Sequence, residues 1–365
     1  MHHLRREIYK LNINLKNYGL TDEITAEAKE FPNLEIARVT QQHRNLYQVV
    51  TSSGFKRAQV SGKFNYQVTM AVNFPAVGDW VLVSTNQNLT IIHRILTRKS
   101  LLTRENSGNK TDGQIIASNI DVIFICMSLN DNFNVRRVER YLTVAWDSGA
   151  VPVVVLTKAD LCDDLADKLA ELEDTCMGVD LVTCSAETHE GFEELRTYTT
   201  RNRTVAFIGS SGVGKSTLIN GLLGKDLLAT KEIRADDDKG RHTTTSRELL
   251  ALPNGGVVID TPGMRELQIY VGDLTKSFAD IEELAKSCRF RNCTHENEPG
   301  CAVKAAVDNG ELSRERLLSY QKLQREMSYD EMNSRQLENE KIKQMFGSKK
   351  RMKQARKHMQ QIKRR

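Results

Sequence analysis

Residues 209–216 read Gly-Ser-Ser-Gly-Val-Gly-Lys-Ser, a complete G-x-x-x-x-G-K-S sequence. The apolar run TVAFI at 204–208 comes directly before it, and the helix-forming run TLINGLLG at 217–224 comes directly after it. A glycine-rich turn between a buried strand and a helix lets backbone N–H groups surround a phosphate. The chain is therefore predicted to contain a P-loop, and with it an α/β domain.

The residues of this loop have different expected roles. Gly209, Gly212 and Gly214 let the backbone curl around phosphate oxygens. The Lys215 amine is expected to reach the β- and γ-phosphates and to act in catalysis, and the Ser216 hydroxyl to ligate Mg²⁺. The full set expected to contact nucleotide here is Gly209, Ser210, Ser211, Gly212, Val213, Gly214, Lys215, Ser216 and Thr217.

A second phosphate motif, Asp260-Thr261-Pro262-Gly263, ends the apolar run GGVVID. Asp260 is predicted to hold Mg²⁺ directly or through water, and the Gly263 N–H to contact the γ-phosphate. This four-residue pattern is common in loops. Its position at a strand end, about 45 residues after the P-loop, supports the phosphate-binding role.

Two segments upstream of the P-loop predict which base is bound. Thr157-Lys158-Ala159-Asp160 ends an apolar run, and Ser185-Ala186 follows the next one. Asp160 is expected to accept two hydrogen bonds from guanine, which adenine cannot supply, while the Lys158 stem lies along the ring. Ser185 and Ala186 are expected to contact the base edge through their backbone. Thr157 stands where asparagine is more usual, so the sequence does not predict the contact that this asparagine makes in the base loop. The selectivity of Asp160 is unaffected.

The motifs occur in the order base, base, phosphate, switch, switch, whereas an ordinary GTPase begins with the phosphate loop. A parallel sheet keeps its arrangement when its ends are relocated, provided the old ends lie close together. We therefore predict a circularly permuted GTPase. The second switch, after Gly263, then leads directly into the C-terminal part of the chain.

Residues 230–248 are polar, charged and poor in apolar side chains, and they are predicted to form the first switch. Thr243, Thr244 and Thr245 are candidates for the Mg²⁺ ligand, and Thr244 is favoured. Met264 stands where many GTPases have a water-orienting glutamine, so we expect slow intrinsic turnover. His242 is the candidate that positions water instead, although a loop histidine that contacts only RNA is the alternative.

The chain divides into regions that differ in composition and in hydrophobic pattern. Five short β-rich runs within 35–100 predict a small barrel of the OB or SH3-like type: IARVTQQ, LYQVVTS, RAQVSGKF (57–64), DWVLVST and TIIHRIL. Alternating strands and helices over 105–275 predict a buried parallel sheet. Residues 1–34 are assigned as an N-terminal extension, 276–335 as a helical domain and 336–365 as a basic tail.

Four potential metal ligands lie within fourteen residues: Cys288, Cys293, His295 and Cys301. Three thiolates and an imidazole suit one structural Zn²⁺ ion. The alternative is a set of scattered buried cysteines beside a surface histidine.

Charge and composition limit the class of protein. Residues 341–365 hold eleven Lys and Arg and no acidic residue, and without them the net charge falls from +5 to −6. Such a tail is typical of an RNA-binding arm, although a solvated extension is possible. The sequence has no membrane-length apolar run and no secretory signal, and its seven cysteines suit a reducing compartment, so we expect a cytoplasmic protein.

The combined order T-K-A-D, S-A, G-S-S-G-V-G-K-S, H-T-T-T, D-T-P-G and C-x₄-C-x-H-x₅-C resembles the RsgA family of small ribosomal subunit biogenesis GTPases over roughly 35–330. The resemblance implies an OB barrel, a permuted GTPase domain and a zinc-binding helical domain. It also implies a factor that binds the small subunit and its rRNA late in assembly and is activated by it. A monomer suffices for all of this.

Two other functions stay open on the sequence alone. One is an rRNA-binding assembly module in which GTP or GDP only sets the conformation. The other is a permuted GTPase of large-subunit assembly, which the N-terminal barrel and the downstream cysteine cluster argue against. Asp160 disfavours an ATPase.

Overall fold

The computed structural model describes residues 13–43, 46–67, 73–86, 89–104, 114–228, 247–261 and 274–330. The chain divides into two compact units, Met1–Gln268 with Thr275–Ser277, and Ile269–Leu274 with Phe278–Arg365. The basic tail at 336–365 lies outside the described residues. Among the helices that the structure describes, none is both long and apolar enough to cross a membrane.

The first unit begins with a closed five-stranded barrel. Its strands are β1 (Glu35–His43), β2 (Leu46–Thr51), β3 (Gly54–Val60), β4 (Trp80–Asn86) and β5 (Leu89–Ile95). They pair in the order β1-β2-β3-β5-β4-β1, with β3 and β5 parallel and the other pairs antiparallel. Alternate apolar residues, among them Val39, Val49 and Val83, fill the interior. The predicted OB-like barrel is confirmed.

The predicted third strand is wrong at its C-terminal end. Residues 61–64 were expected to continue the strand, but α2 (Gly62–Gln67) begins there. The Ser61 hydroxyl accepts the N–H of Phe64 at 3.0 Å, which is the capping arrangement of a helix start. The strand begins earlier than predicted, at Gly54, which has φ 123°, closes a tight turn and pairs with Thr51.

Residues ahead of the barrel form two short helices that the sequence reading did not identify. They are η1 (Leu15–Tyr18) and α1 (Asp22–Ala28), whose first turn is capped by the Thr21 hydroxyl. Leu15 and Ile24 pack against Trp80 of β4 and other apolar barrel residues. The two helices thereby cover apolar barrel side chains that would otherwise be exposed to solvent.

A six-stranded sheet follows the hairpin β6 (Leu101–Arg104) and β7 (Gln114–Ser118). Its parallel strands β8 (Val122–Ser128), β9 (Val151–Thr157), β10 (Asp180–Thr183), β11 (Thr204–Ile208) and β13 (Val257–Asp260) lie in the order β10-β9-β8-β11-β13. The antiparallel β12 (Glu248–Ala251) completes one edge, where it pairs with β1 of the barrel. The strands that precede β11 in the sequence thus lie on one side of it and those that follow lie on the other.

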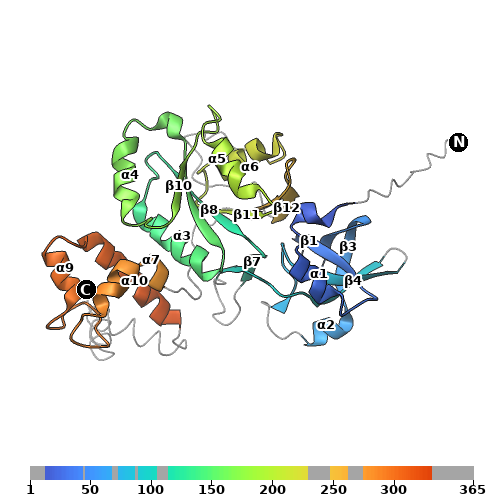
Figure 1. Ribbon diagram of the computed structural model, residues 1–365, viewed down its shortest axis with the longest axis horizontal. Helices are drawn as coiled ribbons and strands as arrows, with labels where there is room; N and C mark the ends of the chain where they lie inside the picture. Colours follow the sequence, from blue (N-terminus) through green and yellow to red (C-terminus); the bar gives the residue numbers. More distant parts are fainter. Residues whose placement is uncertain are drawn as a thin grey trace, which may run out of the picture. The chain divides into compact units, whose positions relative to one another are not determined.

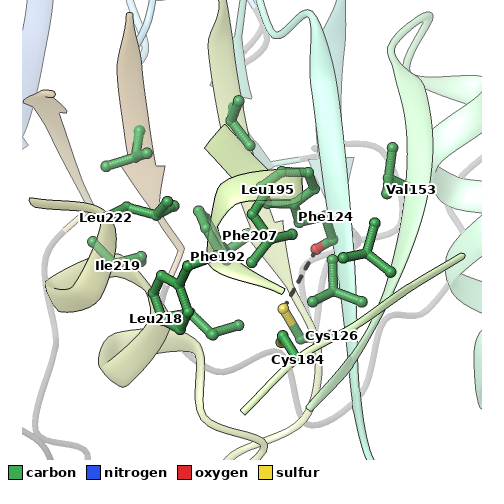
Figure 2. Close-up of a cluster of buried hydrophobic side chains, with 14 of the residues drawn as sticks. Phe124, Cys126, Val153, Cys184, Phe192, Leu195, Phe207, Leu218, Ile219 and Leu222 are labelled. Carbon is green, nitrogen blue, oxygen red and sulfur yellow. Dashed lines mark hydrogen bonds between the residues drawn. The ribbon is translucent and has the colours of Figure 1, made fainter. Parts of the chain in front are cut away.

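Helices cover both faces of this sheet (Figure 1). These are α3 (Val135–Asp147), α4 (Leu165–Glu173), α5 (Phe192–Thr199) and α6 (Lys215–Leu223). A short 3₁₀ turn, η3 (Ala159–Leu161), follows β9. Phe124 and Phe207 meet edge-to-face, with ring centroids 5.2 Å apart, beneath α5 and α6 (Figure 2). Strands β8, β9, β11 and β13 are therefore buried on both faces, as the nearly continuous apolar runs predicted, whereas the edge strand β10 is only partly buried.

A buried arginine links the barrel to the sheet. Arg38 of β1 is 1% exposed, and its guanidinium donates to the carbonyls of Tyr18, Gly78 and Asn119 and, at 2.9 Å, to the hydroxyl of Thr204. Burial lowers the Arg38 pKa to about 10, against the opposing attraction of two nearby aspartates. Since Thr204 opens the strand that leads to the P-loop, this side chain ties the barrel to that strand.

Replacing Arg38 with alanine is expected to lower the free energy of unfolding by about 3 kcal/mol or more, because it leaves buried acceptors unpaired and a cavity behind. Urea unfolding of the two proteins measures the change. Arg57→Ala, on the exposed side of β3, is the matched control and should shift the midpoint little. Equal midpoints for Arg38→Ala and Arg57→Ala would contradict this assignment.

The second unit is helical, with α8 (Ala279–Ala285), α9 (Ala302–Asp308) and α10 (Arg314–Asp330); α7 (Leu274–Ser277) lies at the division between the units. Arg316 of α10 forms a two-pronged ion pair with Asp280 of α8, with donor–acceptor distances of 2.6 and 2.9 Å. Tyr320 donates to Glu282 at 2.8 Å. These contacts hold α10 against the N-terminal half of α8.

Candidate nucleotide-binding and metal sites

The predicted motifs meet at the carboxyl edge of the parallel strands. The P-loop leaves β11 at Ile208, Asp160 follows the end of β9, Ser185 follows β10, and Asp260 ends β13. Ligands of open α/β sheets bind at this edge, close to where the chain order changes. The structure thus brings together four segments that are up to about 100 residues apart in the sequence.

The P-loop has the backbone conformation that its glycines permit. Gly209, Gly212 and Gly214 have φ of 147°, 80° and 97°. At Gly209 a Cβ atom would also lie 2.5 Å from the carbonyl oxygen of Cys126 on the neighbouring strand. Helix α6 then begins at Lys215, so its unpaired N-terminal N–H groups face the loop.

Lys215 is held inside the loop. Its side chain is largely buried, and its Nζ donates to the carbonyls of Gly209 and Ser210, both at 2.7 Å. Burial lowers its pKa, an effect that Cys126 and Asp260 oppose. A buried cation in a cup of backbone N–H groups is suited to bind an anion.

Asp260 supplies a buried carboxylate beside this lysine. It is 3% exposed, and its Oδ2 has no hydrogen-bond partner among the described residues. Burial raises its pKa, and the charge of Lys215 opposes that shift. An unpartnered buried carboxylate oxygen is costly unless a cation completes it, so this donor fits Mg²⁺.

Thr157 connects the base loop to the phosphate loop. Its hydroxyl donates to the carbonyl of Val213 at 2.6 Å, and the side chain is buried. Lys158 follows with a left-handed backbone, φ 62°, and the N–H of Ala159 donates to the carbonyl of Cys184 at 3.2 Å. The departure from asparagine therefore keeps a side-chain bond between the two loops.

Ser185 orients the candidate base-reading carboxylate. Its hydroxyl donates to Oδ1 of Asp160 at 2.5 Å and accepts the N–H groups of Glu187 and Thr188, both at 3.2 Å. Asp160 itself is exposed, while Ala186 packs at the edge of the core. Ser185 was expected to act only through its backbone, but its side chain also contacts the Asp160 carboxylate.

Replacing Asp160 with asparagine is expected to weaken GTP binding by about tenfold or more, because a charged acceptor of two guanine N–H groups is lost. Xanthosine triphosphate should bind the variant better than the parent, since an amide can donate to the xanthine 2-carbonyl. Equilibrium binding of the two nucleotides measures both effects. Asp163→Asn, an exposed neighbour, should change neither. Unchanged preference in Asp160→Asn would contradict the role of this carboxylate.

Several predicted residues lie outside the described part of the chain. They are His242, Thr243, Thr244, Thr245, Gly263 and Met264. Their assigned roles therefore stay predictions.

Two residues beside the P-loop, Asn132 and Arg137, were not predicted from the sequence. Both contact the Ser210 hydroxyl, Asn132 through Nδ2 and Arg137 through Nη1, each at 3.3 Å. A signal existed for Asn132, because the polar run LNDNFN directly follows the buried strand β8, whose end lies at the same edge as β11.

The four predicted metal ligands of the second unit converge. The ligand atoms of Cys288, Cys293, His295 and Cys301 all lie within 4.8 Å of one another. The Cys288 and Cys301 sulfurs are 3.9 Å apart, and His295 Nδ1 lies 3.7 and 3.4 Å from them. In a tetrahedral Zn²⁺ site with Zn–S bonds of about 2.3 Å, two ligand atoms lie about 3.6–3.8 Å apart. These distances are close to that value, so the four donors fit zinc.

Helix α10 holds the histidine end of this cluster. The Gln321 amide donates to the carbonyl of His295 at 2.8 Å, and His295 has a left-handed backbone, φ 59°. Cys301 caps α9, where its sulfur accepts the N–H of Lys304 at 3.4 Å. The cluster therefore joins the loop that precedes α9 to α10.

Comparisons with known proteins agree with this geometry. The profile described as RsgA GTPase matches residues 95–270. The chain is 59% identical to small ribosomal subunit biogenesis GTPase RsgA 2 of Lactiplantibacillus plantarum, covering 94% of this chain and 97% of that protein. It is 46% identical to RsgA 1 of Listeria innocua, covering 86% and 90%.

Solved structures show the same architecture. YjeQ from Thermotoga maritima aligns with a TM-score of 0.60 and 28% identity, over 80% of this chain and 98% of that one. YloQ, described as a circularly permuted GTPase, aligns with a TM-score of 0.58 and 23% identity, over 82% and 97%, a likeness of fold alone.

Fold and site together define a circularly permuted P-loop GTPase, an enzyme that hydrolyses GTP. More specifically, the chain belongs to the RsgA family of small ribosomal subunit biogenesis GTPases.

Proposed function

We propose that the chain hydrolyses GTP while bound to the immature small ribosomal subunit, and that the subunit accelerates this turnover. The observation that carries the proposal is the convergence, at one sheet edge, of a P-loop, a buried unpartnered carboxylate and an exposed base-reading aspartate, in a chain of the RsgA family. This arrangement supports guanine-nucleotide binding, and the family membership supports the partner.

In this proposal each group at the edge has one task. Lys215 and the P-loop N–H groups neutralise the phosphates, and Asp160 with Lys158 selects guanine. Ser216, Thr244 and Asp260 would hold Mg²⁺, which neutralises charge that develops on the phosphate oxygens. Because Asp260 is buried and lacks a hydrogen-bond partner among the described residues, its Oδ2 is suited to a metal or to metal-bound water.

His242 is proposed to orient the attacking water, since Met264 cannot. A His242→Ala protein should bind GTP normally but lose about a hundredfold of its subunit-stimulated turnover, the usual effect of a missing acid–base group. Steady-state phosphate release checks this. Met264→Leu is the matched control, because it changes an apolar neighbour of the same switches, and it should keep normal turnover. Normal subunit-stimulated turnover in the His242→Ala protein would contradict the water-orienting role of His242.

The cysteine–histidine cluster is proposed to hold one structural Zn²⁺ ion. With four protein donors and no position left for substrate, such a site stabilises a fold rather than carrying out chemistry.

The barrel and the basic tail are proposed to contact rRNA. Phe55 and Arg57 of β3 are exposed, as are Leu46 and Leu89 at the two loops where barrels of this type bind oligonucleotides. Aromatic and cationic groups together suit base stacking and phosphate contact.

Co-sedimentation tests the proposed partner. The chain, loaded with a non-hydrolysable GTP analogue, is centrifuged with purified small or large subunits. Binding to small subunits that weakens for a Phe55→Ala/Arg57→Ala double variant is the expected result. Equal binding to large subunits, or none to either, would contradict the proposal.

A further inference from the structure

The loop that follows β8 is built as a chain of polar contacts that runs toward the P-loop. The Ser128 hydroxyl donates to Oδ1 of Asn130 at 2.8 Å, and that same oxygen accepts the N–H of Asn132 at 3.2 Å. Asn132 then reaches the Ser210 hydroxyl through Nδ2. The loop is therefore fixed at the end that lies beside the phosphate loop.

Arg137 completes this arrangement from the first turn of α3. Its backbone N–H donates to the Asn134 side chain, which caps the helix, at 3.0 Å. Its Nη1 donates to Oδ1 of Asn132 at 2.7 Å, to the carbonyl of Asn132 at 3.2 Å, and to the Ser210 hydroxyl at 3.3 Å. Nη1 of the guanidinium is thus held between Asn132 and Ser210.

Ser210 is the point at which this arginine meets the catalytic lysine. Arg137 and Asn132 contact its hydroxyl, while Nζ of Lys215 binds its carbonyl at 2.7 Å. A shift of Ser210 would therefore move one of the two carbonyls that hold the lysine.

The charge of Arg137 also bears on the site. Its hydrogen-bond acceptors among the described residues are neutral oxygens, and the side chain is half-buried. A cation that is not neutralised by a bonded carboxylate, and that contacts the Ser210 hydroxyl of the P-loop, favours a bound anion.

We propose that Arg137, together with Asn132, is a positioning residue for the triphosphate: it fixes Ser210 and through it Lys215. This inference rests on the guanine-nucleotide site proposed above. Because Lys215 is assigned to the β- and γ-phosphates, losing its alignment affects GTP more than GDP.

The test is equilibrium binding of fluorescent GTP and GDP, with KM and kcat for GTP hydrolysis, to the full chain and its variants. Arg137→Met should weaken GTP binding on the order of fivefold, affect GDP less, and raise KM more than it lowers kcat. Arg137→Lys, which keeps the charge but not the fork, should recover part of the loss. Arg136→Met, the exposed neighbour on the same helix, is the control and should match the parent.

A double-mutant cycle with Ser210→Ala tests whether Arg137 acts through Ser210. If Arg137 acts through Ser210, the double variant binds GTP no more weakly than Arg137→Met alone; additive losses overturn the inference. Equal affinities for Arg137→Met and Arg136→Met also overturn it. If Arg137→Met fails to fold in a urea titration, Asn132→Ala replaces it in the same cycle. A parent chain that binds neither nucleotide would instead refute the proposed site itself.

Discussion

Replacing Lys215 with methionine should weaken GTP binding by at least about a hundredfold and bring turnover below detection. The amine is largely buried and aligned by two carbonyls at 2.7 Å, so its charge is not screened by water as a surface lysine's would be. Methionine keeps most of the stem and its packing but removes the charge. Isothermal titration with GTP and a phosphate-release assay measure the two losses.

Lys225→Met is the matched control, because that lysine is exposed just beyond the end of α6 and should be dispensable for binding. Urea unfolding of both variants separates loss of the site from loss of the fold. If Lys215→Met kept GTP turnover, the P-loop assignment would be wrong. If it lost turnover but still supported subunit assembly, the nucleotide would serve only to set conformation.

Replacing Cys301 with serine should release zinc and unfold the second unit. Binding of a structural Zn²⁺ ion contributes on the order of 10 kcal/mol, which a small helical unit cannot lose and stay folded. Cys301 also caps α9, so its sulfur has two structural contacts to lose. Zinc content by atomic absorption and protease resistance of 278–330 measure the effect.

Cys162→Ser is the control, since this half-buried cysteine belongs to the first unit and should leave the zinc content at one ion per chain. A strong chelator should reproduce the Cys301→Ser result on the parent chain. A parent chain purified without zinc, or a Cys301→Ser variant with a full complement, would contradict the metal assignment.

The backbone geometry of the P-loop was predictable because it depends on local sequence. A P-loop needs glycines at fixed spacing between a strand and a helix, and the structure places Gly209, Gly212 and Gly214 at positive φ. The cysteine cluster was likewise predictable, because soft ligands within fourteen residues can meet without knowledge of the fold. The permutation followed from motif order, and the strand order on either side of β11 confirms it.

Long-range contacts could not be predicted in this way. Arg38 is 166 residues from Thr204, and no local pattern marks an arginine whose partners are backbone carbonyls and one hydroxyl. Arg137 is 73 residues from Ser210, and its spacing on α3 resembles that of an ordinary surface cation. The strand that was expected through 61–64 ended early because a serine cap competes with strand pairing, a choice that alternating hydrophobicity does not reveal.

The most direct test of the central claim is GTP turnover by the full chain alone, with purified small subunits, and with large subunits as the comparison. We predict slow turnover alone, strong stimulation by small subunits, and none by large ones. Met264 stands where many GTPases have a water-orienting glutamine, so we expect the partner to complete the site. Turnover that neither subunit changes would contradict the account. It would leave a permuted GTPase whose activating partner has still to be found.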